Sequence, residues 1–494
     1  MVGLQKPHVV VLAFPALGHS IPLLDLSRLV ASQGLTVSYV TTPANVSRFQ
    51  GFVVQAVNNG IDLRLVVLPT PPVEGLPEGR ESIDLLPKAS HGLIFALASK
   101  LQKPFNAWME CQFEQQGASA PVCIVYDTFM GWGRESAQKF KICCMEFNVS
   151  GAFGVSMLIS TSRSVVTMEK EEKQGKECVV LSLDLPWPHR FERDEIAQDF
   201  FNIEDPTLDI VLKILQSIST GSSGLIFNTF EELEPAYVQH LRNLTGKPVW
   251  AIGPMLPPNY FNGAVCVRGK KADVAVDELV QWLDSQSESS VVYVSFGSQI
   301  FFTEQQIKAL ARGLEASLQP FIWAIKVTPS IETATSCNAD LAREYLPEGF
   351  LERTKDRGVI IWGWAPQLLI LSHPSVGALM SHCGWNSTLE SITLGVPTVG
   401  WPMFGDQFFN LRLLAELGMG IQFCEHIPGI PEEEKVKEVL RLVLCDVKGN
   451  EMRARGQKLK KMARKAVEEG GSSKADVQAF ASEMHKLLKM RQEG

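Results

Sequence analysis

Short runs of apolar, β-branched and aromatic residues alternate with helical patterns along almost all of this 494-residue chain. Such alternation is typical of parallel sheets that helices cover on both faces, so we expect an α/β fold. Eleven runs have the pattern of a strand. They lie at 8–14, 35–42, 62–69, 121–127, 143–149 and 224–230 in the first half, and at 291–298, 321–327, 359–366, 377–382 and 398–404 in the second.

Residues 253–273 separate the two sets of strands. This stretch is rich in proline and glycine and lacks periodicity, as interdomain linkers do. Two sheets joined in this way would face each other across a cleft. Open α/β sheets bind ligands at the carboxyl ends of their strands, so the residues that follow each strand are candidates for function. Segments 70–90, 165–205 and 328–340 are irregular, and we expect either specificity loops or plain surface connections there.

The composition argues against several classes of protein. Lys and Arg total 46 against 54 Asp and Glu, and the one basic run, at 452–465, reads as the solvated face of a helix, so no nucleic-acid partner is predicted. The longest early apolar run, at 9–14, is far shorter than the ~20 residues of a membrane-spanning helix, so no membrane insertion is expected. Ten cysteines without a Cys-X-X-Cys pair, and no signal-peptide pattern, favour the cytosol. We expect a monomer.

The stretch 381–397 gathers hydrogen-bond donors where a helix begins. A helix that starts near Trp385 has backbone N–H groups without intrahelical partners, and its positive end attracts anions. Gly384 would let a phosphate approach the backbone, and His382, Asn386 and Ser387 would add side-chain donors. The alternative is an ordinary helix that Asn386 or Ser387 caps.

Neighbouring residues favour a nucleotide sugar as the anion. Trp364 follows a strand and offers a flat face to a base, while Glu390 lies on the helix itself and can accept ribose hydroxyls. Asp406 and Gln407 follow another strand and suit the hydroxyls of a sugar. Ser298 lies in a glycine-containing loop between a strand and a helix, a second place for a phosphate. Base, ribose, diphosphate and sugar would thus be bound in sequence.

A histidine and an aspartate follow two strands of the first half. Gly18 and His19 stand between the first strand and its helix, and Asp127 ends a later strand. The two side chains could form a general base and its orienting carboxylate. A helix cap or a hydrogen-bonded packing residue is the alternative for His19.

The stretch from Trp364 to Gln407 resembles the signature box of the plant secondary-product UDP-glycosyltransferases. The motifs "GH" at 18–19, "D.F..W" from 127, "FNTFEELE", "VWAIGP" and "VYVSFGSQ" also occur in the family's order. The resemblance implies the GT-B fold, two Rossmann-like doubly wound domains that face each other across a cleft. It predicts an acceptor-binding domain at 1–253, a linker at 254–273, a UDP-sugar-binding domain at 274–470, and a last helix at 471–494 that packs back on the first domain.

The resemblance also implies a role for each site residue. Uracil would stack on Trp364, ribose would be held by Gln367 and Glu390, the diphosphate by His382, Asn386 and Ser387, and the sugar by Asp406 and Gln407, with Trp385 beside it. The implied donor-binding residues are Gly18, Ser298, Trp364, Ala365, Gln367, His382, Gly384, Trp385, Asn386, Ser387, Glu390, Asp406 and Gln407. The catalytic residues would be His19, which accepts the proton of an acceptor hydroxyl, and Asp127, which orients its imidazole; the anomeric carbon would be inverted.

No metal or other cofactor is expected, and the UDP-sugar is a co-substrate. The chain contains no Asp-X-Asp motif, so the start of the helix near Trp385 would itself stabilise the leaving group. By the same resemblance, Gln407 and Trp385 imply UDP-glucose as the donor, and the habits of the family favour a flavonoid or other phenolic acceptor.

Several alternatives stay open or can be weighed from the sequence. C-glycosylation of a phenolic and O-glucosylation of a terpenoid or steroid would use the same fold and much the same site. A non-catalytic binding protein for nucleotide sugars or other small molecules would not need His19 and Asp127, and both are present. A Rossmann oxidoreductase would need G-x-G-x-x-G after its first strand, where this chain has one glycine.

Overall fold

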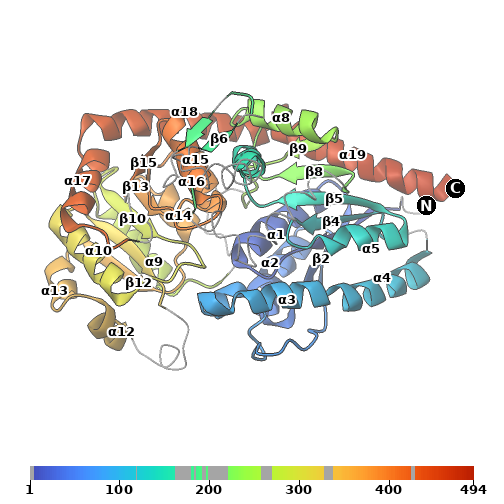
Figure 1. Cartoon of the computed structure of the whole chain (residues 1–494), viewed down its shortest axis with the longest axis horizontal. Coiled ribbons are helices and arrows are strands. Elements are labelled where there is room, and N and C mark those ends of the chain that lie inside the picture. Colours follow the sequence, from blue (N-terminus) through green and yellow to red (C-terminus); the bar gives the residue numbers. More distant parts are fainter. Residues whose placement is uncertain are drawn as a thin grey trace, which may run out of the picture.

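Two parallel sheets form the two lobes of the protein in the computed structural model (Figure 1). The structure describes residues 5–117, 120–161, 180–182, 185–187, 189–191, 196–197, 221–257, 270–327, 338–423 and 429–493. Most of the expected loops at 165–205 and 328–340, and the middle of the linker, lie outside these residues.

Both sheets have the strand order of a doubly wound fold, and every pairing within them is parallel. The first contains, from edge to edge, β3 (Leu63–Val67), β2 (Thr36–Thr41), β1 (His8–Leu12), β4 (Cys123–Asp127), β5 (Cys143–Asn148), β8 (Gly224–Phe227) and β9 (Val249–Ala251). The second contains β12 (Gly358–Trp362), β11 (Phe321–Ile325), β10 (Val291–Ser295), β13 (Val376–Ser381), β14 (Thr398–Gly400) and β15 (Gly420–Gln422). A separate hairpin joins β6 (Val180–Ser182) to β7 (His189–Phe191).

All eleven expected strands are confirmed. The strands that the sequence did not predict are β6, β7, β9 and β15, each of which has three residues. A strand of three residues shows no apolar period by itself. β14 is equally short and was expected only because of the longer run at 398–404.

Helices cover both faces of each sheet. In the first domain they are α1 (Leu17–Ala31), α2 (Val46–Asn58), α3 (Gly92–Lys100), α4 (Gln102–Gln116), α5 (Trp132–Phe140), the helical segment 152–161 and α8 (Pro235–Thr245). In the second they are α9 (Val276–Asp284), α10 (Glu304–Ser317), α12 (Asn338–Tyr345), α13 (Phe350–Thr354), α14 (Gln367–Ser372), α15 (Trp385–Leu394), α16 (Gln407–Glu416), α17 (Glu433–Leu444) and α18 (Val447–Val467).

The side chains of the central strands alternate between two cores. In β1, Val9 and Val11 belong to the core beneath α1 and α2, whereas Val10 and Leu12 belong to the core beneath α3 and α4. Successive residues of a strand point to opposite faces, so a strand covered on both sides must be apolar at every position. This explains why these strands stand out in the sequence as continuous apolar runs.

The last helix, α19 (Ser472–Glu493), leaves the second domain and lies along the first (Figure 1). Its Val477 and Phe480 are buried in the core that contains Val9. Its Asp476 accepts a hydrogen bond from the Ala251 backbone N–H at 2.7 Å. The first domain therefore contains residues from both ends of the chain. No helix in the described parts combines the length and the apolar character that a bilayer crossing requires.

Candidate functional site

The two candidate residues of the first domain meet because their strands are neighbours. β1 and β4 pair in parallel, so their carboxyl ends lie side by side. Asp127 is the last residue of β4, and His19 lies in the first turn of α1, which follows β1. His19 Nδ1 is 2.9 Å from one carboxylate oxygen of Asp127 and 3.1 Å from the other.

The Asp127 carboxylate fixes the histidine tautomer. Asp127 is fully buried, and one of its oxygens also accepts a hydrogen bond from the Phe129 backbone N–H at 2.8 Å. A carboxylate only accepts hydrogen bonds, so Nδ1 of His19 carries the proton and Nε2 is left with its lone pair. This arrangement makes Nε2 of His19 able to take up a proton.

Aromatic rings surround this histidine. The ring centroids of Phe14 and Phe129 lie 5.3 and 4.8 Å from that of His19, and Phe95 packs against both phenylalanines. The base is therefore placed among apolar, flat side chains, which suit an aromatic or other lipophilic molecule.

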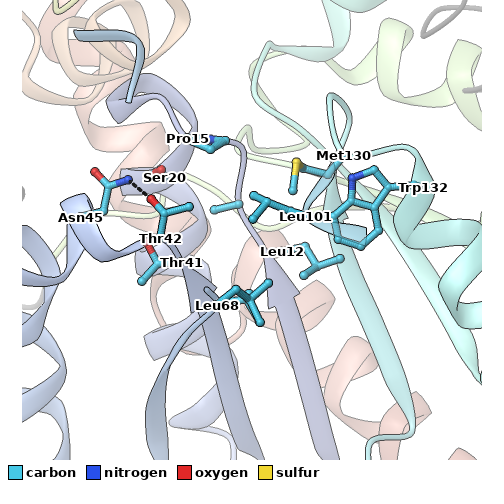
Figure 2. A pocket seen from close by; sticks show the side chains of 12 residues that line it. Leu12, Pro15, Ser20, Thr41, Thr42, Asn45, Leu68, Leu101, Met130 and Trp132 are labelled. Atoms are coloured by element: carbon cyan, nitrogen blue, oxygen red, sulfur yellow. Dashed lines mark hydrogen bonds between the residues drawn. The ribbon is translucent and has the colours of Figure 1, made fainter. Parts of the chain in front are cut away.

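A small cavity lies nearby in the first domain, where β1 and β2 end (Figure 2). Leu12, Leu68 and Trp132 are among its apolar lining residues, and Thr42 and Asn45 are among the polar ones. Its volume of about 10 Å³ is close to what one water molecule needs, so the cavity is too small for an acceptor.

On the opposite side, α15 begins with free backbone donors. Gly384 is the N-cap, and no side chain of the described residues caps this helix. The preceding Cys383 has a φ of +62°, in the left-handed region, which turns the chain sharply from β13 into the helix. The alternative of a helix capped by Asn386 or Ser387 is thus wrong, and the first turn retains its capacity to bind an anion.

The ring of His382 fits between two glycines. A Cβ on Gly297 would lie 2.6 Å from Nε2 of His382, and a Cβ on Gly384 would lie 2.5 Å from it, so neither position has room for a larger residue. Burial of the ring and the nearby Lys326 lower the pKa of His382 to about 3. His382 is therefore neutral at physiological pH and acts as a hydrogen-bonding group rather than as a cation. Ser298, the next residue after Gly297, lies half-buried in the same loop.

The start of α15 touches the start of α1. Asn386 donates a hydrogen bond from Nδ2 to the backbone carbonyl of Gly18 at 2.7 Å, across the interface between the domains. Gly18 immediately precedes His19. The candidate anion site and the candidate base are therefore joined by one direct contact.

Hydrogen bonds also join the start of α14 to α15, and the loop before α14 to Asp273. Gln367 donates from Nε2 to Ser387 Oγ at 3.0 Å and to Glu390 Oε2 at 2.7 Å, which brings these three residues together. Ala365 is buried just before them. The backbone N–H of Trp364 donates to the Asp273 carboxylate at 2.7 Å.

The candidate sugar-binding residues follow β14, and one of them, Asp406, contacts the first domain. Asp406 accepts hydrogen bonds from Ser150 at 2.6 Å and from Asn410 at 3.0 Å, both at the same carboxylate oxygen. Gln407 uses its amide oxygen to accept from the Met403 and Phe404 backbone at 2.8 and 3.2 Å, which leaves its amide nitrogen for a ligand.

Trp385, the neighbouring candidate, is buried. It donates from its indole nitrogen to the Asn228 carbonyl of the first domain at 2.9 Å. Its indole therefore takes part in the contact between the domains.

Three further side chains belong to the site that the sequence analysis did not single out: Ser150, Asp273 and Lys326. Lys326 had a signal, since it is a lone cation directly after the apolar strand β11. The only sequence signal for Ser150 was its position shortly after β5. No sequence signal marked Asp273. In the described parts of the chain no three His, Cys, Asp or Glu side chains cluster as metal ligands would.

Two protein-family models match the chain. "Glycosyltransferase, N-terminal domain" matches residues 6–257, and "UDP-glucoronosyl and UDP-glucosyl transferase" matches residues 230–454. Among curated proteins, the scopoletin glucosyltransferase of Nicotiana tabacum is 36% identical over 471 residues, which cover 93% of this chain and 94% of the relative.

Solved structures share the fold over both domains. UGT73P12 of Glycyrrhiza uralensis, complexed with glycyrrhetinic acid 3-O-monoglucuronide, superposes with a TM-score of 0.84 at 29% identity, over 99% of this chain and 97% of that one. TcCGT1 in complex with UDP has a TM-score of 0.80 at 28% identity, over 98% of this chain and 100% of that one.

Proposed function

Because this chain belongs to the UDP-glycosyltransferase family and has its GT-B fold, we propose that it transfers glucose from UDP-glucose to a hydroxyl group of a small lipophilic plant metabolite. The observation that carries the proposal is the His19–Asp127 pair, which follows Gly18, the residue whose backbone carbonyl accepts a hydrogen bond from Asn386 in the first turn of α15. A base and an anion site in contact are what a direct displacement at a sugar phosphate requires.

In this mechanism Nε2 of His19 takes the proton of the acceptor hydroxyl, and the oxygen attacks the anomeric carbon from the face opposite UDP. The bond from that carbon to the diphosphate oxygen breaks, UDP leaves with the electron pair, and the configuration is inverted. Asp127 stabilises the imidazolium that forms, because its carboxylate already faces Nδ1. Removing such a base typically costs about 10²–10⁴-fold in rate.

The order of the strands supports the donor assignment. From β12 through β10 and β13 to β14, the carboxyl edge of the second sheet presents Trp364, Ser298, His382 and Asp406 in turn. We assign the base to Trp364, the ribose to Gln367 and Glu390, the diphosphate to the start of α15 with its neighbours, and the sugar to Asp406 and Gln407. The backbone donors of α15 supply the electrostatic stabilisation of UDP, and we propose that no metal takes part.

A flavonoid or another phenolic is the proposed acceptor class. The aromatic rings around His19 support this choice, and the tobacco relative is named for scopoletin. A terpenoid acceptor is the second candidate, because UGT73P12 was solved with glycyrrhetinic acid 3-O-monoglucuronide. The proposal places a monomeric enzyme in the cytosol.

Incubation of the purified chain with UDP-glucose and a panel of phenolic and terpenoid acceptors tests the proposal. Mass spectrometry should show the addition of one hexose, and NMR of the product should show inversion at the anomeric carbon and a C–O rather than a C–C link. Competition with UDP-galactose and UDP-glucuronate should leave glucose preferred. Binding of UDP without a product from any acceptor would instead support a non-catalytic binding protein.

A further inference from the structure

Lys326 lies between two residues that the proposed function assigns to the donor nucleotide. It follows β11, which pairs with β12 on one side and β10 on the other. Its ammonium nitrogen is 5.2 Å from the ring centroid of Trp364, and its charge lowers the pKa of His382. The cation is thus placed at the carboxyl edge of the sheet, within the row of candidate donor ligands.

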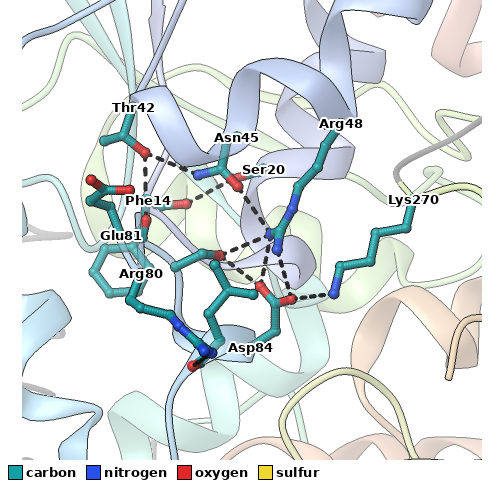
Figure 3. A network of polar contacts seen from close by, with 11 residues as sticks. Phe14, Ser20, Thr42, Asn45, Arg48, Arg80, Glu81, Asp84 and Lys270 are labelled. Atoms are coloured by element: carbon teal, nitrogen blue, oxygen red, sulfur yellow. Dashed lines mark hydrogen bonds and ion pairs between the residues drawn. The ribbon is translucent and has the colours of Figure 1, made fainter. Parts of the chain in front are cut away.

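The two carboxylates near Lys326, Asp84 and Asp273, are already engaged by other groups, and Figure 3 shows the partners of Asp84. Asp84 is held by Arg48 at 2.9 and 3.1 Å and by Lys270 at 2.7 Å. Asp273 accepts the backbone N–H of Trp364. Within the described residues, the ammonium of Lys326 contacts the Trp364 ring and forms no ion pair with a carboxylate.

The net charge of the groups around Lys326 is therefore positive. Arg48, Lys270 and Lys326 gather around Asp84, with Asp273 as the second carboxylate. Burial and then Lys270 lower the pKa of Lys326 to about 8, against the opposing effect of Asp84 and Asp273. A partly buried ammonium that forms no ion pair is unfavourable, so the binding of an anion beside Lys326 is favourable.

We propose that Lys326 binds the diphosphate of the donor nucleotide, with its ammonium donating to a phosphate oxygen between the base on Trp364 and the helix start beside His382. An ammonium carries three donors and a compact charge, which suits a phosphate that other groups already orient. The inference rests on the proposed function and adds a binding residue outside the box from Trp364 to Gln407.

The test compares ligands that differ only in phosphate. Isothermal titration of the whole chain with uridine, UMP and UDP should show that Lys326→Met raises the Kd for UDP by about tenfold to a hundredfold, as expected when a hydrogen bond to a charged group is lost. The Kd for uridine should change by less than about threefold. An unchanged Kd for UDP would overturn the inference. So would an equal loss for uridine and UDP, because Lys326 would then act only by orienting Trp364.

Matched variants test whether a loss of affinity for UDP comes from the charge of Lys326, from its position or from a folding defect. Lys326→Arg keeps the charge and should keep most of the affinity for UDP. Lys437→Met removes a lysine from α17, where it pairs with Glu434 at 3.0 Å, and should leave the Kd unchanged. Ligand-free melting temperatures verify that each variant folds, and Lys326→Gln replaces the Met variant if that one does not.

A pH series adds a second readout. Lys326 loses its charge as the pH rises through about 8, so the parent chain should bind UDP more weakly above that pH, whereas Lys326→Met should show no such change. The charged and titratable groups that face Lys326 are Arg48, Lys270, Asp84, Asp273 and His382. A parent chain that binds no UDP at pH 7 would contradict the proposed function itself, whereas equal binding by parent and variant contradicts only the role of Lys326.

Discussion

At the scale of single residues, His19 has one ring nitrogen committed to Asp127 and one free. We expect His19→Ala to reduce turnover on a hydroxyl acceptor by at least about 100-fold, because the proposed general base is removed. UDP should still raise the melting temperature nearly as much as in the parent, since most of the proposed donor-binding residues lie in the second domain and a ligand stabilises the state that binds it.

Asp127→Asn is the companion variant, and it should lose activity to a smaller but still large extent. The imidazole remains, but the charge that stabilises its protonated form is gone. Near-normal turnover of a folded His19→Ala variant would remove histidine from the mechanism and leave activation to another group or to the acidity of the acceptor.

At the scale of elements, the start of α15 depends on a glycine. We expect Gly384→Ala to weaken UDP binding by about tenfold or more, because its Cβ would lie 2.5 Å from Nε2 of His382 and would displace that ring. Thermal shift with UDP measures the effect. Gly51→Ala, in the open middle of α2, is the control and should bind UDP normally. An undiminished shift in the Gly384 variant would show that the ring of His382 does not help to hold UDP.

The elements also show what a sequence can predict. Strands buried on both faces are apolar at every position and could be predicted, whereas β9 and β15 are too short to show a pattern. Candidate site residues could be found because they follow strands. The hydrogen bonds from Ser150 to Asp406 and from Trp364 to Asp273 span 256 and 91 positions, so no local pattern marks them.

At the scale of the whole molecule, Asp84 ties the first domain to the end of the interdomain linker, because it pairs with Arg48 of α2 and with Lys270. We expect Asp84→Asn to lower the free energy of unfolding by about 3 kcal/mol, because two cations lose their buried carboxylate. Urea unfolding measures this loss. Glu110→Gln, which removes an exposed pair with Lys139, should change it by less than about 1 kcal/mol.

The same carboxylate predicts a pH dependence. Burial alone would raise the pKa of Asp84, but Arg48 and Lys270 outweigh it and hold the pKa well below its usual range. The contribution of Asp84 to the free energy of unfolding is therefore present above the ordinary pKa of an unfolded aspartate, about 4. It is lost as the pH falls through the pKa of Asp84 in the folded protein. Plots of unfolding free energy against pH for the parent and Asp84→Asn should converge towards low pH. Plots that stay parallel would contradict the stabilising role of the ion pairs of Asp84.

A further prediction for the whole enzyme concerns metals. Activity should persist in excess EDTA, because in the proposed mechanism the backbone donors of α15 and its neighbours stabilise the departing UDP. Steady-state rates with and without chelator measure this. Complete loss of turnover that Mg²⁺ or Mn²⁺ restores would refute the metal-free account.

The path of α19 also bears on how the chain folds during synthesis. Val477, Phe480 and Met484 fill the core beneath the first strand of the protein, although more than 400 residues separate them from it in sequence. A ribosome makes the chain from the N-terminus, and contacts so distant in sequence form late. The first domain is synthesised first, but it cannot finish folding until α19 has emerged, because α19 fills part of its core.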